Sequence, residues 1–140
     1  MASASCIFCK IISGSAPATK LFENEEFVAF KDIKPAANFH CLVIPKQHIL
    51  NIKSLSTHED KLLVERMMQV GKRILEENNG NLNDLRLGFH CPPFNSVGHL
   101  HMHVISPASE MSLYNKLIFQ PNTYWFQSAE DTLNQLNNKL

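Results

Sequence analysis

The chain has 140 residues, and its 13 lysine and arginine residues balance 13 aspartate and glutamate residues, so its formal net charge is zero. This length fits a single domain over residues 1–140. The balanced charge argues against a dedicated nucleic-acid or membrane-surface binder and favours a small ligand. Nowhere does the sequence approach the roughly eighteen consecutive apolar residues of a membrane-spanning helix.

The N-terminal residues lead us to expect an intracellular protein, and this expectation guides the interpretation of the cysteines. Residues 1–5 (MASAS) lack the basic start and apolar run of a secretion signal, so we expect a cytoplasmic protein, with the nucleus as a further location. In such a compartment, a Cys-x-x-Cys pair such as Cys6 and Cys9 is more often a metal or redox site than a disulfide. Cys41 and Cys91 are expected to be small core or loop residues.

The first part of the chain predicts a short helix followed by a β-hairpin. Residues 6–12 (CIFCKII) suit one or two helical turns, which the small residues 13–15 (SGS) end. Residues 20–22 and 26–30 then form two short strands around a turn at 24–25. The chain therefore enters its sheet through an antiparallel pair.

A third strand and a long helix follow. Residues 39–44 are rich in strand formers and stop at Pro45. Two pairs, Ser56 with Glu59 and Thr57 with Asp60, have the spacing of a capping box, and we expect a helix from about Thr57 to Asn78 that packs one apolar stripe on the sheet. The stripe consists of Leu63, Met67, Val70 and Ile74.

Two further strands, 85–90 and 99–105, are predicted as antiparallel neighbours joined by the proline-containing loop 91–98. Beyond them the pattern weakens to apolar islands at 117–119 and 124–126, followed by a short terminal helix capped at Ser128. The predicted fold is α+β: an antiparallel sheet of about five strands with one long helix and short terminal helices.

Strict alternation of histidine with apolar residues marks the segment 99–105 (HLHMHVI). On a strand, His99, His101 and His103 would share one face, with neighbouring imidazoles about 6.6 Å apart and the outer pair roughly 13 Å apart. Two neighbours could bind one metal ion, whereas three could not easily do so. A sheet face that carries histidines by chance is the competing interpretation, and the triple repeat favours a functional site.

This segment has the form His-φ-His-φ-His-φ-φ, where φ is an apolar residue, and resembles the signature of the histidine triad (HIT) family of nucleotide-binding and nucleotide-hydrolysing proteins. Segments 30–35 (FKDIKP) and 39–49 (FHCLVIPKQHI) resemble the family in the same order, as do Asn95 and Ser96 before the triad. The resemblance implies a HIT-like fold. The loop after Gly88 and the aromatic tail at 124–126 resemble the third paralogous group of the family's nucleotide-binding branch.

The resemblance implies a catalytic set. His101 would be the nucleophile, forming a nucleotidyl-histidine intermediate that water hydrolyses. A neutral imidazole, with its pKa near 6.5, suits this role because one nitrogen is free at pH 7. His103 would contact phosphate oxygens, Ser96 would donate to the phosphate or leaving group, and His40 would close the cluster from the adjacent strand. His99, the first histidine of the triad, completes the set. Taken singly, His40 also suits an ordinary strand histidine, and Ser96 an ordinary loop serine.

The nucleotide-binding set is likewise implied by the resemblance. Asp32 would accept hydrogen bonds from ribose hydroxyls and Ile33 would form a wall for the base. Asp32 also suits a turn residue that binds its own backbone. Many family members have a glycine-rich loop before the triad, whereas this loop contains prolines, so phosphate contacts would come from side chains such as His90 and Asn95. The full set is Asp32, Ile33, His90, Phe94, Asn95, Ser96, His101 and His103.

A second constellation suits a metal. Cys6 and Cys9, with His48 and His99, supply the four ligands of a closed tetrahedral zinc site, an arrangement that some family members carry. This zinc would be structural and tie the N-terminal turn to the sheet. No cofactor is expected for catalysis.

The resemblance implies a hydrolase that splits the P–N bond of adenosine 5′-monophosphoramidates and related AMP adducts. The expected partners are AMP and its amine adducts and a second copy in a homodimer built on the long helix and the sheet edge, with no membrane or nucleic acid. Three alternatives stay open. The chain could release AMP from pyrophosphate-linked or DNA-linked adenylates, bind nucleotides without turnover as a regulator, or use a catalytic zinc held by two strand histidines.

Overall fold

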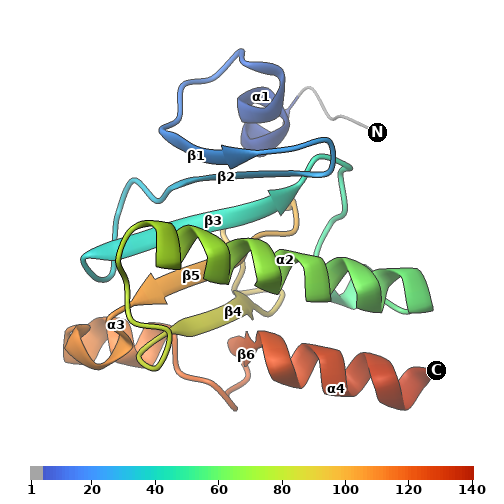
Figure 1. Ribbon diagram of the computed structural model, residues 1–140. Helices are drawn as coiled ribbons and strands as arrows, with labels where there is room; N and C mark the ends of the chain where they lie inside the picture. Colours follow the sequence, from blue (N-terminus) through green and yellow to red (C-terminus); the bar gives the residue numbers. More distant parts are fainter. Residues whose placement is uncertain (1–4) are drawn as a thin grey trace.

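The computed structural model describes residues 5–140, so residues 1–4 of the segment predicted to lack a secretion signal lie outside it. Within the described residues, an antiparallel sheet of six strands has the order β1-β2-β3-β5-β4-β6 (Figure 1). The α+β prediction is confirmed, but the predicted number of strands was one too low. The strands are β1 (Lys20–Glu23), β2 (Phe27–Lys31), β3 (Phe39–Pro45), β4 (Arg86–His90), β5 (Met102–Ser106) and β6 (Phe126–Ser128).

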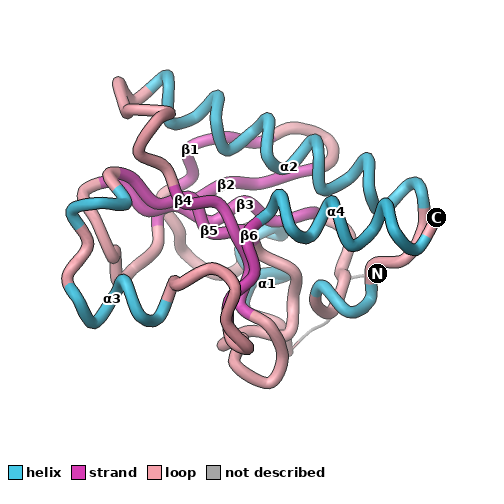
Figure 2. Tube along the Cα trace, turned by 90° about the horizontal axis from the view of Figure 1, so that it is seen from below, coloured by secondary structure: helices cyan, strands magenta, loops and turns pink. Residues whose placement is uncertain are grey.

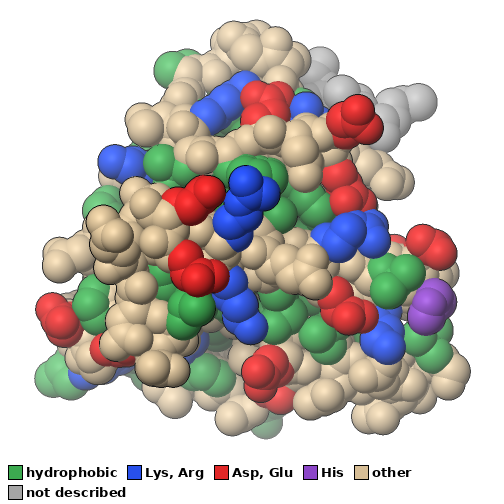
Figure 3. Space-filling model, in the orientation of Figure 1, with side chains coloured by type: hydrophobic (Ala, Val, Ile, Leu, Met, Phe, Trp, Pro, Cys, Tyr) green, Lys and Arg blue, Asp and Glu red, His purple; other side chains and the backbone are tan. Residues whose placement is uncertain are grey.

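Helices cover both faces of this sheet. In Figure 2, α2 (His58–Glu77) and α4 (Ala129–Lys139) lie side by side on one face, and α1 (Ile7–Ser13) lies on the other. A further short helix, α3 (Leu113–Ile118), follows β5. Acidic and basic side chains are interspersed over the face that α2 and α4 form (Figure 3). Among the described residues, no helix is both long enough and apolar enough to span a membrane.

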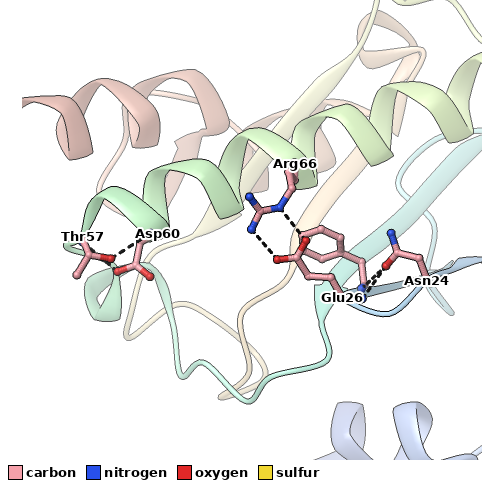
Figure 4. A network of polar contacts seen from close by, with 6 residues as sticks. Asn24, Glu26, Thr57, Asp60 and Arg66 are labelled. Atoms are coloured by element: carbon pink, nitrogen blue, oxygen red, sulfur yellow. Dashed lines mark hydrogen bonds and ion pairs between the residues drawn. The ribbon is translucent and has the colours of Figure 1, made fainter.

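The long helix α2 has the predicted ends. The Thr57 hydroxyl accepts the N–H of Asp60 at 3.1 Å, and the Asp60 carboxylate accepts the N–H of Thr57 at 3.1 Å, which completes the capping box. Asn79, with φ of 60°, takes the left-handed conformation just past the end. Arg66 donates two hydrogen bonds, of 2.7 and 2.6 Å, to the Glu26 carboxylate. This pair connects α2 to the residue before β2 (Figure 4).

Alternation along β3 and β5 sends side chains to opposite faces, as predicted. Cys41 and Val43, together with Met102 and Val104, join the apolar core beneath α2. The intervening side chains face α1 and α3 instead. These are His40, Leu42, His103 and Ile105.

The histidine strand is shorter than predicted. Regular pairing begins with Met102 opposite Val43, so His99 and His101 precede the ladder rather than lie in it. The reason is a bond to a segment distant in sequence, because the Leu100 N–H donates to the Ile49 oxygen at 2.6 Å, outside the sheet. The rings still lie together, because Phe8 packs against both His99 and His101, and His101 packs against His103.

The segment after Pro107 contains elements that the sequence pattern did not reveal. Its first apolar island includes the end of α3. This helix is capped by Ser112, whose hydroxyl accepts the N–H of Asn115 at 3.1 Å. The second island leads into β6, which pairs with β4 over three residues. The predicted terminal helix is confirmed as α4, capped by Ser128.

Candidate active site

Four histidines from three strands and one loop gather on the sheet face beneath α1 and α3. His40 comes from β3, His90 ends β4, His103 lies on β5 and His101 immediately precedes it. Ring centroids of His103 lie 5.2 Å from those of His40 and His101 and 5.0 Å from that of His90. Sequence positions up to 63 residues apart therefore form one imidazole cluster.

His101 has the tautomer that a nucleophile needs. Its Nδ1 lies 2.8 Å from the main-chain oxygen of His99. A carbonyl oxygen only accepts hydrogen bonds, so Nδ1 carries the proton and Nε2 keeps a free electron pair. Burial lowers the pKa of His101, which favours the neutral ring. The ring of Phe8 from α1 packs edge-on against it, with centroids 5.1 Å apart.

His103 is held on both sides. Its Nδ1 lies 2.9 Å from Nε2 of His40, and its Nε2 lies 3.3 Å from Nδ1 of His90. Burial holds the pKa of His103 well below its ordinary value, so this ring is neutral. Because both nitrogens have partners, the predicted contact with phosphate requires that one of them be exchanged.

His40 and Asp32 form the edge of the cluster. The Ala36 N–H donates to Nδ1 of His40 at 2.9 Å, while Nε2 of His40 lies 3.4 Å from Oδ2 of Asp32. Burial lowers the pKa of His40 to about 4 despite this carboxylate. Oδ1 of Asp32 accepts the Lys34 N–H at 2.8 Å, as expected for a turn residue. The ribose contact of Asp32 stays a prediction.

The remaining predicted binding residues lie at the surface beside this cluster. Ile33 and Phe94 are 93% and 55% exposed, which leaves two large apolar side chains for a ligand. Ser96 is exposed and forms no hydrogen bond with the described residues. The Asn95 side chain donates to the Val97 oxygen at 3.3 Å and lines a pocket shared with His90 and His101.

The predicted metal ligands converge. The ligand atoms of Cys6, Cys9, His48 and His99 all lie within 4.8 Å of one another. Nε2 of His99 lies 2.8 Å from the Pro45 oxygen and therefore carries the proton, which leaves Nδ1 free to face the thiols. Two thiols and two imidazoles are a donor set that zinc prefers, so these residues fit the metal.

A second group of side chains of the types that bind metals is not suited to hold a metal ion. Asp32, His40 and His103 also come within 4.8 Å of one another. A neutral histidine that binds a metal through Nε2 must carry its proton on Nδ1, yet Nδ1 of His40 accepts the Ala36 N–H. This donor set therefore does not suit a metal ion, while the alternative of a catalytic zinc held by two histidines of the 99–105 segment stays a hypothesis.

Two aromatic residues of the site were not predicted. Phe8 packs against both His99 and His101, at 5.9 and 5.1 Å between centroids. Phe119 packs against His40, His90 and His103 at 5.0 to 5.5 Å. A phenylalanine between the two cysteines could have drawn attention to Phe8, whereas no sequence signal indicated Phe119.

Comparison with known proteins agrees with this fold and site. The family model described as "Scavenger mRNA decapping enzyme C-term binding" matches residues 5–118. A mouse protein named adenosine 5′-monophosphoramidase HINT3 is 46% identical over 134 residues, which cover 94% of this chain and 81% of that protein. A histidine triad protein from Clostridium difficile has a TM-score of 0.70 at 32% identity and covers 75% of this chain and 92% of its own.

A zinc-bound histidine triad family protein from Mycobacterium smegmatis covers 97% of this chain and 98% of its own, with a TM-score of 0.64 and 28% identity. Fold, imidazole cluster and relatives together define a class of small α+β proteins whose site is built from histidines. This chain belongs to the histidine triad family.

Proposed function

We propose that this chain is a hydrolase that splits the P–N bond of adenosine 5′-monophosphoramidates and related AMP adducts. One observation carries the proposal: the free electron pair on Nε2 of a neutral, buried His101. The name of the mouse relative, adenosine 5′-monophosphoramidase, supports this substrate class.

The proposed reaction has two displacements. Nε2 of His101 forms a bond to phosphorus, and the P–N bond breaks as the leaving amine takes up a proton from solvent, while Ser96 donates a hydrogen bond to the phosphate or the leaving group. The His99 carbonyl stabilises the ring, because its hydrogen bond to Nδ1–H strengthens as the imidazole becomes cationic. Water then attacks phosphorus and gives up a proton to solvent, the Nε2–P bond breaks with its electron pair returning to a neutral His101, and AMP leaves.

The test is turnover of a fluorogenic adenosine phosphoramidate by the full chain and by His101→Asn, with AMP binding measured separately. Turnover that the variant loses while it still binds AMP supports the proposal. If neither the wild type nor His101→Asn turns over the substrate and both bind AMP, the chain is a nucleotide-binding regulator. Faster release of AMP from a pyrophosphate-linked or DNA-linked adenylate would make the phosphoramidate a secondary substrate.

The metal that we propose for Cys6, Cys9, His48 and His99 is a structural zinc. The Nδ1 lone pair of His99 supports it, as does the zinc-bound relative from Mycobacterium smegmatis. When bound, zinc would supply crosslinks between α1 and the sheet and no step of the reaction. This leaves His101 and His103 to the nucleotide.

The homodimer remains a proposal with a constraint. The outer edge of β4 pairs with β6, and α4 lies beside α2 (Figure 1). A partner at this end of the sheet would therefore meet β6 and α4 along Gly88–His90, and would reach the edge of β4 only at Arg86 and Leu87. Light scattering coupled to gel filtration measures the mass directly, and a mass of one chain at micromolar concentration would contradict the dimer.

A further inference from the structure

His90 links the imidazole cluster to α3. Its Nε2 lies 3.1 Å from the main-chain oxygen of Ile118, at the end of α3, and its Nδ1 lies 3.3 Å from Nε2 of His103. The Ile118 oxygen only accepts hydrogen bonds, so Nε2 of His90 carries the proton. In the neutral ring, Nδ1 of His90 is then an acceptor, and it faces His103.

His40, on the other side of His103, favours the same order of donors and acceptors along the three rings. The Ala36 N–H donates to Nδ1 of His40, so the proton of His40 sits on Nε2, which lies 2.9 Å from Nδ1 of His103. Asp32 is a second acceptor for the same His40 proton, at 3.4 Å, and does not reverse this order. Two main-chain groups from separate elements therefore make Nδ1 of His103 an acceptor and Nε2 a donor.

We propose that His40 and His90 together hold His103 as the Nε2–H tautomer, and that His90 is the positioning residue whose hydrogen bond from His103 Nε2–H is exchanged for one to an incoming phosphate oxygen. The contact of His103 with His90, at 3.3 Å, is longer than its 2.9 Å contact with His40, so the His90 side is the weaker one. A phosphate oxygen is charged and accepts more strongly than a neutral imidazole nitrogen. This inference rests on the proposed function, because it needs a phosphate in the site.

The arrangement also gives the segment after Pro107 a role. Ile118 supplies the carbonyl that fixes His90, and the ring of Phe119 packs against His90 and His103 with centroids 5.0 Å from each. The end of α3 thus acts on the reaction through His90 and His103, without touching the phosphorus itself.

Nitrogen-15 NMR of the histidine-labelled full chain tests the tautomers without any ligand. We expect His40, His90 and His103 as neutral Nε2–H rings and His101 as a neutral Nδ1–H ring. In the single variants His40→Phe and His90→Phe, His103 should keep its proton on Nε2, because one main-chain end still sets the direction. Wild-type His103 with its proton on Nδ1 would overturn the inference even if neither variant folds.

Addition of AMP tests the exchange, with adenosine as the matched ligand that lacks phosphate. We expect AMP to shift His101, His103 Nε2 and His90 Nδ1 together, and adenosine to leave the last two unchanged. If His101 responds to AMP while His90 does not, the exchange is wrong and the proposed function stands. If no histidine responds at saturating AMP, the proposed nucleotide site itself is wrong, and the exchange fails with it.

Discussion

The Nδ1 of His101 lies 2.8 Å from the main-chain oxygen of His99, so the proposed nucleophile is oriented by the backbone of a proposed metal ligand. The ring of His99 is fixed in turn by the Pro45 oxygen at 2.8 Å. Pro45 of β3 therefore fixes the ring of His99, and the main chain of His99 fixes the ring of His101. Since Phe8 also touches both rings, α1 takes part in holding them.

Replacement of the nucleophile should abolish turnover without unfolding the protein. His101→Asn keeps a polar side chain but removes the Nε2 electron pair, and we expect kcat to fall by at least about 10³-fold. Steady-state kinetics on an adenosine phosphoramidate gives the number, and circular dichroism checks the fold. His58→Asn, the same substitution at an exposed position on α2, serves as the control and should keep full activity. Unchanged kcat in His101→Asn would remove His101 from the reaction.

Asp32→Asn separates the two roles of this carboxylate. The asparagine keeps an oxygen for the Lys34 N–H and so preserves the turn, but it loses the charge that ribose hydroxyls would bind. We expect KM to rise about tenfold, as for the loss of one hydrogen bond to a charged group, with little change in Tm. If KM stays the same and only Asp32→Ala lowers Tm, the residue serves the turn alone.

Short-range patterns predicted the elements they control. The cap at Ser128 and the strand alternation over 102–105 depend on neighbours within four residues, and both were predicted from the sequence; the capping box of the long helix was narrowed to two overlapping candidates, of which the structure has the one at Thr57. Phe119 was not predicted, because its contact with three imidazoles depends on where α3 docks. The start of β5 at Met102 also depends on a distant group, the Ile49 oxygen.

The candidate site divides in the same way. Family motifs placed residue types such as His40 and His103 near one another, but which ring nitrogen carries a proton depends on main-chain groups that only the fold brings close. The Ala36 N–H and the Ile118 oxygen are two such groups. For this reason no sequence pattern distinguishes the metal-compatible His99 from the metal-incompatible His40.

Loss of a thiol should release the metal and loosen α1. We expect the wild type to contain one zinc per chain and Cys9→Ser to contain little, with a fall in unfolding free energy of several kcal/mol, since structural zinc contributes on the order of 10 kcal/mol. Cys91→Ser is the control, because Cys91 lies outside the cluster. Elemental analysis and thermal unfolding measure both effects. Full zinc content in Cys9→Ser would rule out this ligand set.

Acid should destabilise the fold through its buried histidines. His40 has its pKa lowered from 6.5 to about 4, so the unfolded chain binds protons more readily than the folded one. Stability is therefore complete above pH 6.5 and falls as the pH drops toward 4, by about 3 kcal/mol from His40 alone. His90 and His103, whose pKa values burial also lowers, add to the same slope.

Urea unfolding at several pH values between 7 and 4 measures this slope. His40→Asn should flatten it, whereas His58→Asn, at an exposed position, should leave it unchanged. The same slope in wild type and His40→Asn would show that His40 titrates normally in the folded chain.

The last prediction concerns the close packing of α2 on β5, the strand that carries His103. A Cβ added at Gly71 would lie 2.9 Å from Cγ2 of Val104 and 3.1 Å from Cε of Met102, the two β5 residues that flank His103. Met102 can move its terminal methyl, but the branched Val104 is stiff, so the helix must shift. Alanine gains up to about 1 kcal/mol in helix propensity, and overpacking costs about 1–3 kcal/mol.

Urea unfolding measures the balance of these two effects. We expect the unfolding free energy to fall by about 1 kcal/mol in Gly71→Ala and to stay the same in Glu76→Ala, on the exposed side of α2. If Gly71→Ala is more stable than the wild type, Val104 and Met102 of β5 can move enough to accommodate the added methyl group.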